Sequence, residues 1–126
     1  MASILVIDDD TQLRTMLKNL LQRNGFIVMD APDGKVGMNL FRRSPTDLVI
    51  TDIIMQEKEG IETIMELRDD FPEVKIIAMS GGGQIGPEVY LDVARGLGAN
   101  HILTKPFNSN ELLEIVRELL DVKIQD

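Results

Sequence analysis

Residues 4–10 have the sequence ILVIDDD, in which four apolar residues lead directly into three carboxylates. An apolar run without polar alternation is typical of a strand buried on both faces, as in a parallel sheet covered by helices. Two carboxylates at the end of such a strand, Asp8 and Asp9, repel each other unless a cation or a proton compensates their charge. The stretch therefore predicts both the type of sheet and a site at its edge.

Short apolar runs alternate five times with helix-length amphipathic segments along the chain. We expect strands at residues 3–8, 26–30, 47–52, 75–80 and 101–104. This alternation predicts right-handed crossovers and one α/β domain over residues 1–126, with a (βα)5 doubly wound five-stranded parallel sheet. The fourth helix is expected to begin at Pro87 and to end near residues 96–98.

Helical periodicity supports the segments between the strands. In the first segment the apolar residues recur on one helix face, at Leu13, Met16, Leu17, Leu20 and Leu21. Asp10 is expected to cap the N-terminus of this helix, and Asn108 that of the last helix. The second helix, at residues 33–43, has the weakest pattern because Gly34 and Gly37 interrupt it.

Polar residues end four of the expected strands at the edge where ligands of such sheets bind. They are Asp8, Asp9, Asp52, Ser80 and Lys105. Asp52 is the best candidate nucleophile, because a carboxylate can attack phosphorus to give an aspartyl phosphate. Asp8 and Asp9 offer the oxygen ligands that Mg²⁺ prefers, and the metal would bridge Asp52 and the phosphoryl oxygens. Lys105, Ser80 and the backbone N–H groups of residues 81–83 would bind the phosphoryl oxygens.

The composition excludes several other classes of protein. Of the 126 residues, 13 are basic and 21 acidic, with no cluster of Lys and Arg, so direct nucleic-acid binding is not expected. The absence of cysteine excludes a disulfide framework and fits a reducing compartment. No apolar run approaches the ~18 residues that span a bilayer, and there is no signal-peptide pattern. We expect a soluble cytoplasmic protein that does not bind membranes.

Five ordered motifs resemble those of the receiver domains of bacterial two-component response regulators, over essentially the whole chain. They are the acidic pair after the first strand, TDIIM at residues 51–55, Gly60, MSGG at residues 79–82, and LGANHILTKPF at residues 97–107. The resemblance implies the flavodoxin-like strand order 2-1-3-4-5. It also implies a signalling switch that assists only its own phosphorylation and dephosphorylation, not an enzyme for an external metabolite.

The resemblance further implies a source for the phosphoryl group and a set of metal ligands. Asp52 would accept the group from a sensor histidine kinase or a histidine phosphotransferase in a Mg²⁺-dependent reaction. Asp9, Asp52 and the carbonyl oxygen of Ile54 would bind Mg²⁺ directly, and Asp8 would act mainly through water. The phosphorylated form would then control a partner or an output domain.

Four residues complete the implied site. Ser80 would be the switch hydroxyl, with Gly81 beside it in the phosphoryl-binding loop, and Lys105 would be the phosphoryl-binding cation. The peptide bond between Lys105 and Pro106 would be cis, which proline permits.

Three departures from the family pattern bear on how the switch would work. Gln56 stands where the family usually has proline, so the loop after the acceptor has one constraint fewer. Ile102 occupies a position where many members carry an aromatic switch residue, so the rotation of an aromatic ring there is excluded as the output. The three glycines at residues 81–83 have much backbone entropy to lose on ordering. We therefore expect phosphorylation to order this loop and the start of the fourth helix.

Two other functions fit parts of the sequence. A small phosphatase resembling the haloacid dehalogenases would place its nucleophile in residues 8–11, but it would leave Met55 and Gly60 unexplained. A pseudo-receiver would bind partners without being phosphorylated, which the intact acidic pair, acceptor, hydroxyl and lysine disfavour. The sequence leaves open whether the chain stands alone or comes from a longer regulator.

Overall fold

A single parallel sheet forms the centre of the structure, a computed structural model that describes residues 2–53, 60–81, 92 and 95–121. Its strands are β1 (Ser3–Ile7), β2 (Ile27–Ala31), β3 (Leu48–Asp52), β4 (Lys75–Ser80) and β5 (His101–Thr104). Their spatial order is β2-β1-β3-β4-β5, and every neighbouring pair is parallel. This order confirms the expected fold class, and no strand boundary differs from the expected one by more than one residue.

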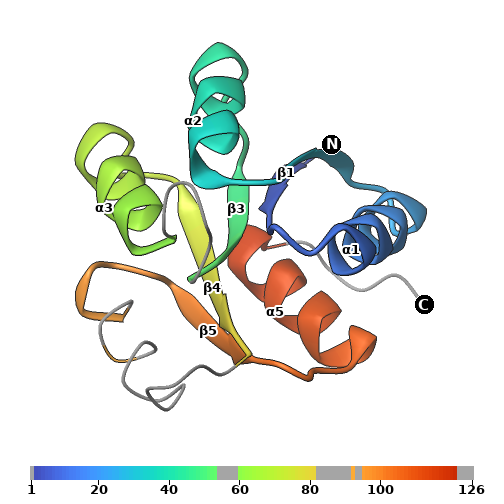
Figure 1. Cartoon of the computed structure of the whole chain (residues 1–126). Coiled ribbons are helices and arrows are strands. Elements are labelled where there is room, and N and C mark those ends of the chain that lie inside the picture. Colours follow the sequence, from blue (N-terminus) through green and yellow to red (C-terminus); the bar gives the residue numbers. More distant parts are fainter. Residues whose placement is uncertain (1, 54–59, 82–91, 93–94, 122–126) are drawn as a thin grey trace.

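Helices cover both faces of the sheet (Figure 1). The described helices are α1 (Thr11–Arg23), α2 (Gly34–Arg43), α3 (Gly60–Asp70) and α5 (Ser109–Leu120). Figure 1 shows α1 and α5 on one face and α2 and α3 on the other. Most of the expected fourth helix, including Pro87, lies outside the described residues. None of the helices in the described ranges is long and apolar enough to cross a membrane.

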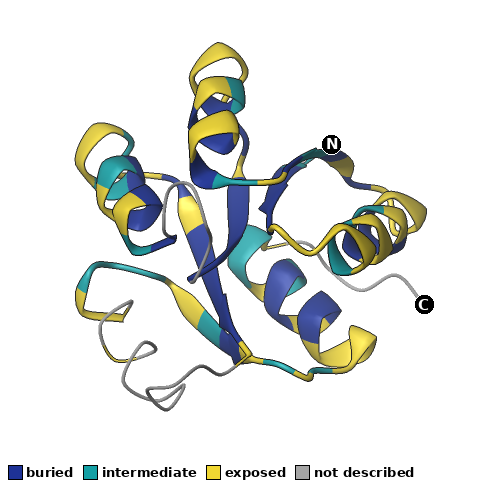
Figure 2. Ribbon diagram, viewed as in Figure 1, coloured by how far each residue is buried: buried dark blue, intermediate teal, exposed yellow. Residues whose placement is uncertain are grey.

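Alternate strand residues face opposite sides of the sheet and so build two hydrophobic cores. In β1, Ile4 and Val6 pack in the core with α1 and α5, whereas Leu5 and Ile7 pack in the core with α2 and α3. All four side chains are fully buried, as the absence of polar alternation predicted. Figure 2 shows the buried central strands β1 and β3 between helices whose outer faces are exposed.

Side-chain caps begin the helices where the sequence predicted them. The Asp10 carboxylate accepts hydrogen bonds from the backbone N–H groups of Gln12 and Leu13, and Asn108 accepts one from Glu111. One expectation for α1 was wrong: Met16, which the periodicity placed on the buried face, is 42% exposed. The buried residues of α1 are Leu17, Leu20 and Leu21, so Met16 lies beside the buried stripe and not within it.

The two glycines that weaken the pattern of α2 have a structural explanation. Asp33 caps the helix, and Gly34 is its first residue. A Cβ atom on Gly37 would lie 2.5 Å from Cδ1 of Ile7. Gly37 therefore lets α2 approach β1 closely, and this packing outweighs the low helix propensity of glycine.

Gly60 allows the first turn of α3 to lie against the end of β3. Its N–H group donates a hydrogen bond to the Ile53 carbonyl oxygen over 2.8 Å. A Cβ atom on Gly60 would overlap the Asp52 carbonyl oxygen and would lie 2.6 Å from Cα of Ile53. Because both neighbours are backbone atoms, the clash could be relieved only by moving the strand end or the helix.

Gly60→Ala should therefore lower the free energy of unfolding by about 2–3 kcal/mol, the usual range for overpacking a tight contact. Chemical denaturation of the metal-free protein measures this. The matched control is Gly96→Ala, because Gly96 is helical and a Cβ atom there would meet nothing within 4 Å. The control should change stability by less than about 1 kcal/mol and in the favourable direction. Equal effects of the two substitutions would contradict the argument.

Candidate functional site

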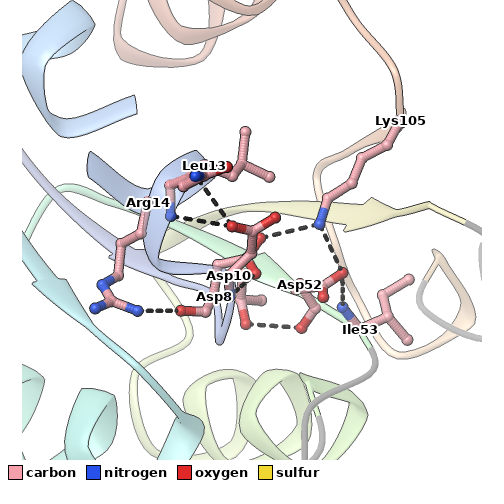
Figure 3. A network of polar contacts seen from close by, with 9 residues as sticks. Asp8, Asp10, Leu13, Arg14, Asp52, Ile53 and Lys105 are labelled. Atoms are coloured by element: carbon pink, nitrogen blue, oxygen red, sulfur yellow. Dashed lines mark hydrogen bonds and ion pairs between the residues drawn. The ribbon is translucent and has the colours of Figure 1, made fainter. Parts of the chain in front are cut away.

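The carboxyl ends of β1, β3 and β5 bring Asp8, Asp52 and Lys105 together (Figure 3). Asp8 and Asp9 directly follow β1, and Asp52 is the last residue of β3. One carboxylate oxygen from each of these three residues lies within 4.8 Å of the others. Lys105 directly follows β5 and reaches the same place, as Figure 3 shows. The convergence that the sequence predicted is therefore present in the tertiary structure.

One ammonium group partly compensates the three carboxylates. Nζ of Lys105 lies 3.0 Å from Oδ2 of Asp8 and 3.6 Å from Oδ1 of Asp52. Asp8 is fully buried and Asp52 is 8% exposed, so water screens these charges poorly. Three negative charges against one positive charge leave the site short of cations.

The pKa of Asp52 reflects its burial first and the surrounding charges second. Burial raises the pKa of Asp52 to about 6, from the usual 3.8. The positive charge of Lys105 opposes the increase, and the negative charges of Asp8 and Asp9 add to it. For Lys105, burial favours the neutral form, but Asp8 and Asp52 outweigh it, so the pKa of Lys105 is raised. The ammonium group therefore stays charged at neutral pH.

Gly81 and the backbone of β4 hold Lys105 in place. The Lys105 N–H group donates to the Ser80 carbonyl oxygen over 2.8 Å, and a Cβ atom on Gly81 would lie 3.1 Å from Cδ of Lys105. Gly81 thus leaves room for the aliphatic part of the lysine side chain. The Lys105–Pro106 peptide bond is cis. Residues 82–83, and with them most of the loop expected to become ordered, lie outside the described residues.

Ser80 carries a hydroxyl group that lacks a partner. The residue is 1% exposed, and among the described residues no group makes a hydrogen bond to its Oγ atom. A buried hydroxyl without a partner is costly and uncommon. An incoming oxygen at the strand ends, such as a phosphoryl oxygen, would supply one.

The donor set fits a hard divalent cation. Asp8, Asp9 and Asp52 offer only carboxylate oxygens, which are the ligands that Mg²⁺ prefers, and their excess negative charge favours a cation. Asp9 is exposed, so water can complete the coordination on that side. The expected fourth ligand, the carbonyl oxygen of Ile54, lies outside the described residues, as does Gln56.

The structure adds two contacts of Asp8 and the packing of Ile102 to what the resemblance implies. Asp8 forms a direct ion pair with Lys105, and its other oxygen, Oδ1, accepts a hydrogen bond from the Asp10 N–H group over 2.9 Å. Asp8 therefore organises the turn and the lysine as well as adding charge for a cation. Ile102 is partly buried and packs against the core under α2 and α3.

Comparisons with known proteins agree with this geometry. The sequence matches the family model described as "Response regulator receiver domain" over residues 4–117. It is 38% identical over 120 residues to the transcriptional regulatory protein CpxR of Klebsiella pneumoniae, covering 95% of this chain and 50% of CpxR. It is 32% identical over 119 residues to the chemotaxis protein CheY of Bacillus subtilis, covering 94% of this chain and 97% of CheY. The chain belongs to the receiver domain family, a signalling module rather than a classical enzyme.

Solved structures show the same fold. A receiver domain from Clostridium thermocellum superposes with a TM-score of 0.88 at 28% identity, covering 96% of this chain and 95% of that one. The response regulator TrrA of Thermotoga maritima, solved in complex with Mg²⁺-BeF, gives 0.81 at 32% identity, covering 94% and 99%. The chain spans about half the length of CpxR and nearly all of CheY.

Reasoning from the sequence missed one residue beside the site. Arg14, in the second turn of α1, donates a hydrogen bond from Nη1 to the Asp8 carbonyl oxygen over 2.7 Å. The residue follows Asp10 by four positions and so lies one turn beyond the helix cap. That spacing was the available signal, but the contact depends on where α1 packs against β1 and β2.

The raised pKa of Asp52 predicts how stability depends on pH. The folded state binds the proton more tightly than the unfolded chain, so the stabilisation is complete below about pH 4 and is lost as pH rises through about 6. A difference of about two pKa units corresponds to about 3 kcal/mol. Asp52→Asn should therefore make the metal-free protein more stable than the parent at pH 7, by an order of 2–3 kcal/mol, with the difference vanishing near pH 4.

Denaturation of both proteins in a chelating buffer, at intervals from pH 4 to pH 8, measures the difference. Asp92→Asn, which removes an exposed carboxylate, is the control and should change stability by less than about 0.5 kcal/mol. A difference between Asp52→Asn and the parent that stays constant with pH would contradict the analysis.

Proposed function

We propose that the chain is a phosphorylation-dependent switch in which Asp52 accepts a phosphoryl group from a sensor histidine kinase or a histidine phosphotransferase. The observation that carries this proposal is the position of Asp52, which lies between two further carboxylates and the Lys105 ammonium group. The Mg²⁺-BeF complex of TrrA supports Mg²⁺ as the cofactor. Asp9, Asp52 and the carbonyl oxygen of Ile54 would bind the cation directly, and Asp8 would act mainly through water; the convergence of the three carboxylates supports this set.

Each residue of the site has a part in the transfer. An ionised oxygen of Asp52 attacks phosphorus, and the bond from phosphorus to the donor breaks, with its electron pair leaving on the donor. Mg²⁺, when bound, would neutralise charge on the equatorial phosphoryl oxygens. Lys105 supplies a second positive charge, and the Ser80 hydroxyl gains the partner it lacks. Because the pKa of Asp52 is about 6, most of the acceptor is ionised at neutral pH.

The same contacts give a reason for a change of conformation. Phosphoryl oxygens on Asp52 would compete with Asp8 for the Lys105 ammonium group, which lies 3.0 Å from Asp8 before the reaction. They would also draw the Ser80 hydroxyl and the adjoining Gly81 toward the site. A group that contacts these residues in only one of two states shifts the population toward that state.

The domain organisation and setting belong to the same proposal. Residues 1–126 would form one receiver unit, supported by a single sheet with a core on each face. Its place would be the cytoplasm, where a sensor kinase presents its phosphorylated histidine. The kinase and the downstream partner would be specific to this chain, and the half-length match to CpxR fits an output domain in a longer regulator.

Incubation with acetyl phosphate and Mg²⁺ tests the proposal. The intact mass should rise by one phosphoryl group, and chelation of the metal should prevent the increase, because the charge on the incoming group would then be uncompensated. Asp52→Asn should abolish the increase. Asp47→Asn, at the opposite end of β3, should leave it unchanged.

Two results would point to the other functions. No mass increase in the parent protein, under conditions that phosphorylate a known receiver domain, would favour a pseudo-receiver. Steady turnover of a phosphate ester that survives Asp52→Asn but not Asp8→Asn would favour a phosphatase.

A further inference from the structure

A chain of polar contacts runs from the edge strand β2 to the metal-binding turn. Lys18 and Arg14, both on α1, contact the two oxygens of Asp30 in β2, at 3.2 Å from Nζ to Oδ1 and 2.9 Å from Nε to Oδ2. Arg14 then uses Nη1 to donate to the Asp8 carbonyl oxygen over 2.7 Å. Figure 3 shows this guanidinium group reaching the Asp8 backbone on the side away from Lys105.

The guanidinium group is well placed to act as a brace. Its side chain is 14% exposed, so both contacts are largely shielded from water. Hydrogen bonds to a charged donor are stronger than neutral ones, and the planar guanidinium holds its two acceptors in a fixed relation. Asp30 pairs with Val6 in the sheet register and is therefore fixed to β1 by the backbone.

The turn at residues 8–10 needs support from Arg14, because few contacts hold Asp9 in position. Asp8 is held by its N–H group, which donates to Ala31, and by Lys105. Among the described residues, the Asp9 side chain has neither a hydrogen bond nor an ion pair, and it is exposed. Its position relative to Asp52 is therefore set by the backbone of the turn, which Arg14 contacts at residue 8.

We propose that Arg14, anchored by Asp30, is a positioning residue that holds the turn at residues 8–10 in the geometry that binds Mg²⁺. Arg14 touches neither the cation nor the phosphoryl group. It acts by fixing the Asp8 backbone, so that the Asp9 and Asp52 carboxylates converge before a metal arrives. The inference rests on the Mg²⁺ site of the proposed function.

Because Arg14 is positively charged, the direction in which its replacement changes the Mg²⁺ affinity tests the proposal. A guanidinium group close to a cation site repels the cation, so a purely electrostatic role predicts tighter Mg²⁺ binding when Arg14 is replaced. A positioning role predicts weaker binding, because a less ordered turn must be organised by the metal itself. Partners that orient metal ligands typically account for tenfold or more in affinity.

Titration of the parent protein and Arg14→Gln with Mg²⁺ alone, followed by calorimetry or amide chemical shifts, tests this. We expect about tenfold weaker binding by Arg14→Gln. Hydrogen exchange of the amides of residues 8–10 should also be faster in the metal-free variant. Arg14→Lys keeps the charge, but an ammonium group cannot hold the Asp30 carboxylate and the Asp8 carbonyl oxygen in the fixed geometry of a planar guanidinium. It should therefore restore only part of the affinity.

Two companion variants separate positioning from general stability. Asp30→Asn leaves Arg14 in place but removes its anchor and should speed hydrogen exchange of the amides of residues 8–10 in the metal-free protein. That readout does not depend on the repulsion of a cation, so it keeps the test valid if Arg14→Gln folds poorly. Lys18→Gln removes another contact to Asp30 without reaching Asp8, and it should leave the affinity within about twofold of the parent.

Two results would overturn the inference. Equal or tighter Mg²⁺ binding by a folded Arg14→Gln would do so while leaving the proposed function intact, even if its thermal stability fell. An absence of Mg²⁺ binding by the parent protein would remove the metal site, and with it both proposals.

Discussion

Three carboxylates share one ammonium group at the carboxyl edge of the sheet, and this imbalance of charge governs what the site can bind. Lys105 pairs directly with Asp8 and lies 3.6 Å from Asp52, so it holds the cluster together without neutralising it. Full neutralisation would leave no reason to bind a cation, and no positive charge at all would make the buried carboxylates prohibitively costly. The domain is thus folded yet short of positive charge, as expected of a site that waits for Mg²⁺ and a phosphoryl group.

The hydrophobic cores must offset the unfavourable free energy of placing these carboxylates close together. Two cores, one on each face of the sheet, fix the strands so that Lys105 meets Asp8 although 97 positions separate them. Packing at close quarters serves the same end, since Gly60 lets α3 lie against the end of β3 and Gly81 leaves room for the lysine. Among the described residues, the one buried side-chain polar atom without a hydrogen-bond partner, the Ser80 hydroxyl oxygen, lies at a strand end. This distribution is usual for functional sites on rigid folds.

Different residues around the site set its charge and its geometry. Lys105 and the carboxylates determine which ligands are attracted, whereas the caps and the Arg14 contact determine how the turn is presented. Such indirect support is easily overlooked, because an arginine that contacts a backbone carbonyl leaves no motif. Ile102 carries no aromatic ring, and it packs instead against the core under α2 and α3.

The sequence by itself determined the alternation of strands and helices, the strand boundaries to within a residue, and the candidates at the strand ends. Continuous apolar runs favour strands buried on both faces, and parallel strands place their carboxyl ends at one edge. Tertiary structure alone decided that Asp8 takes the direct contact with Lys105, that Met16 is exposed, and that Arg14 joins Asp30 to the site. The first depends on β1 and β5 ending at the same edge of the sheet, and the other two depend on how α1 packs against β1 and β2. Local periodicity carries no information about such distances.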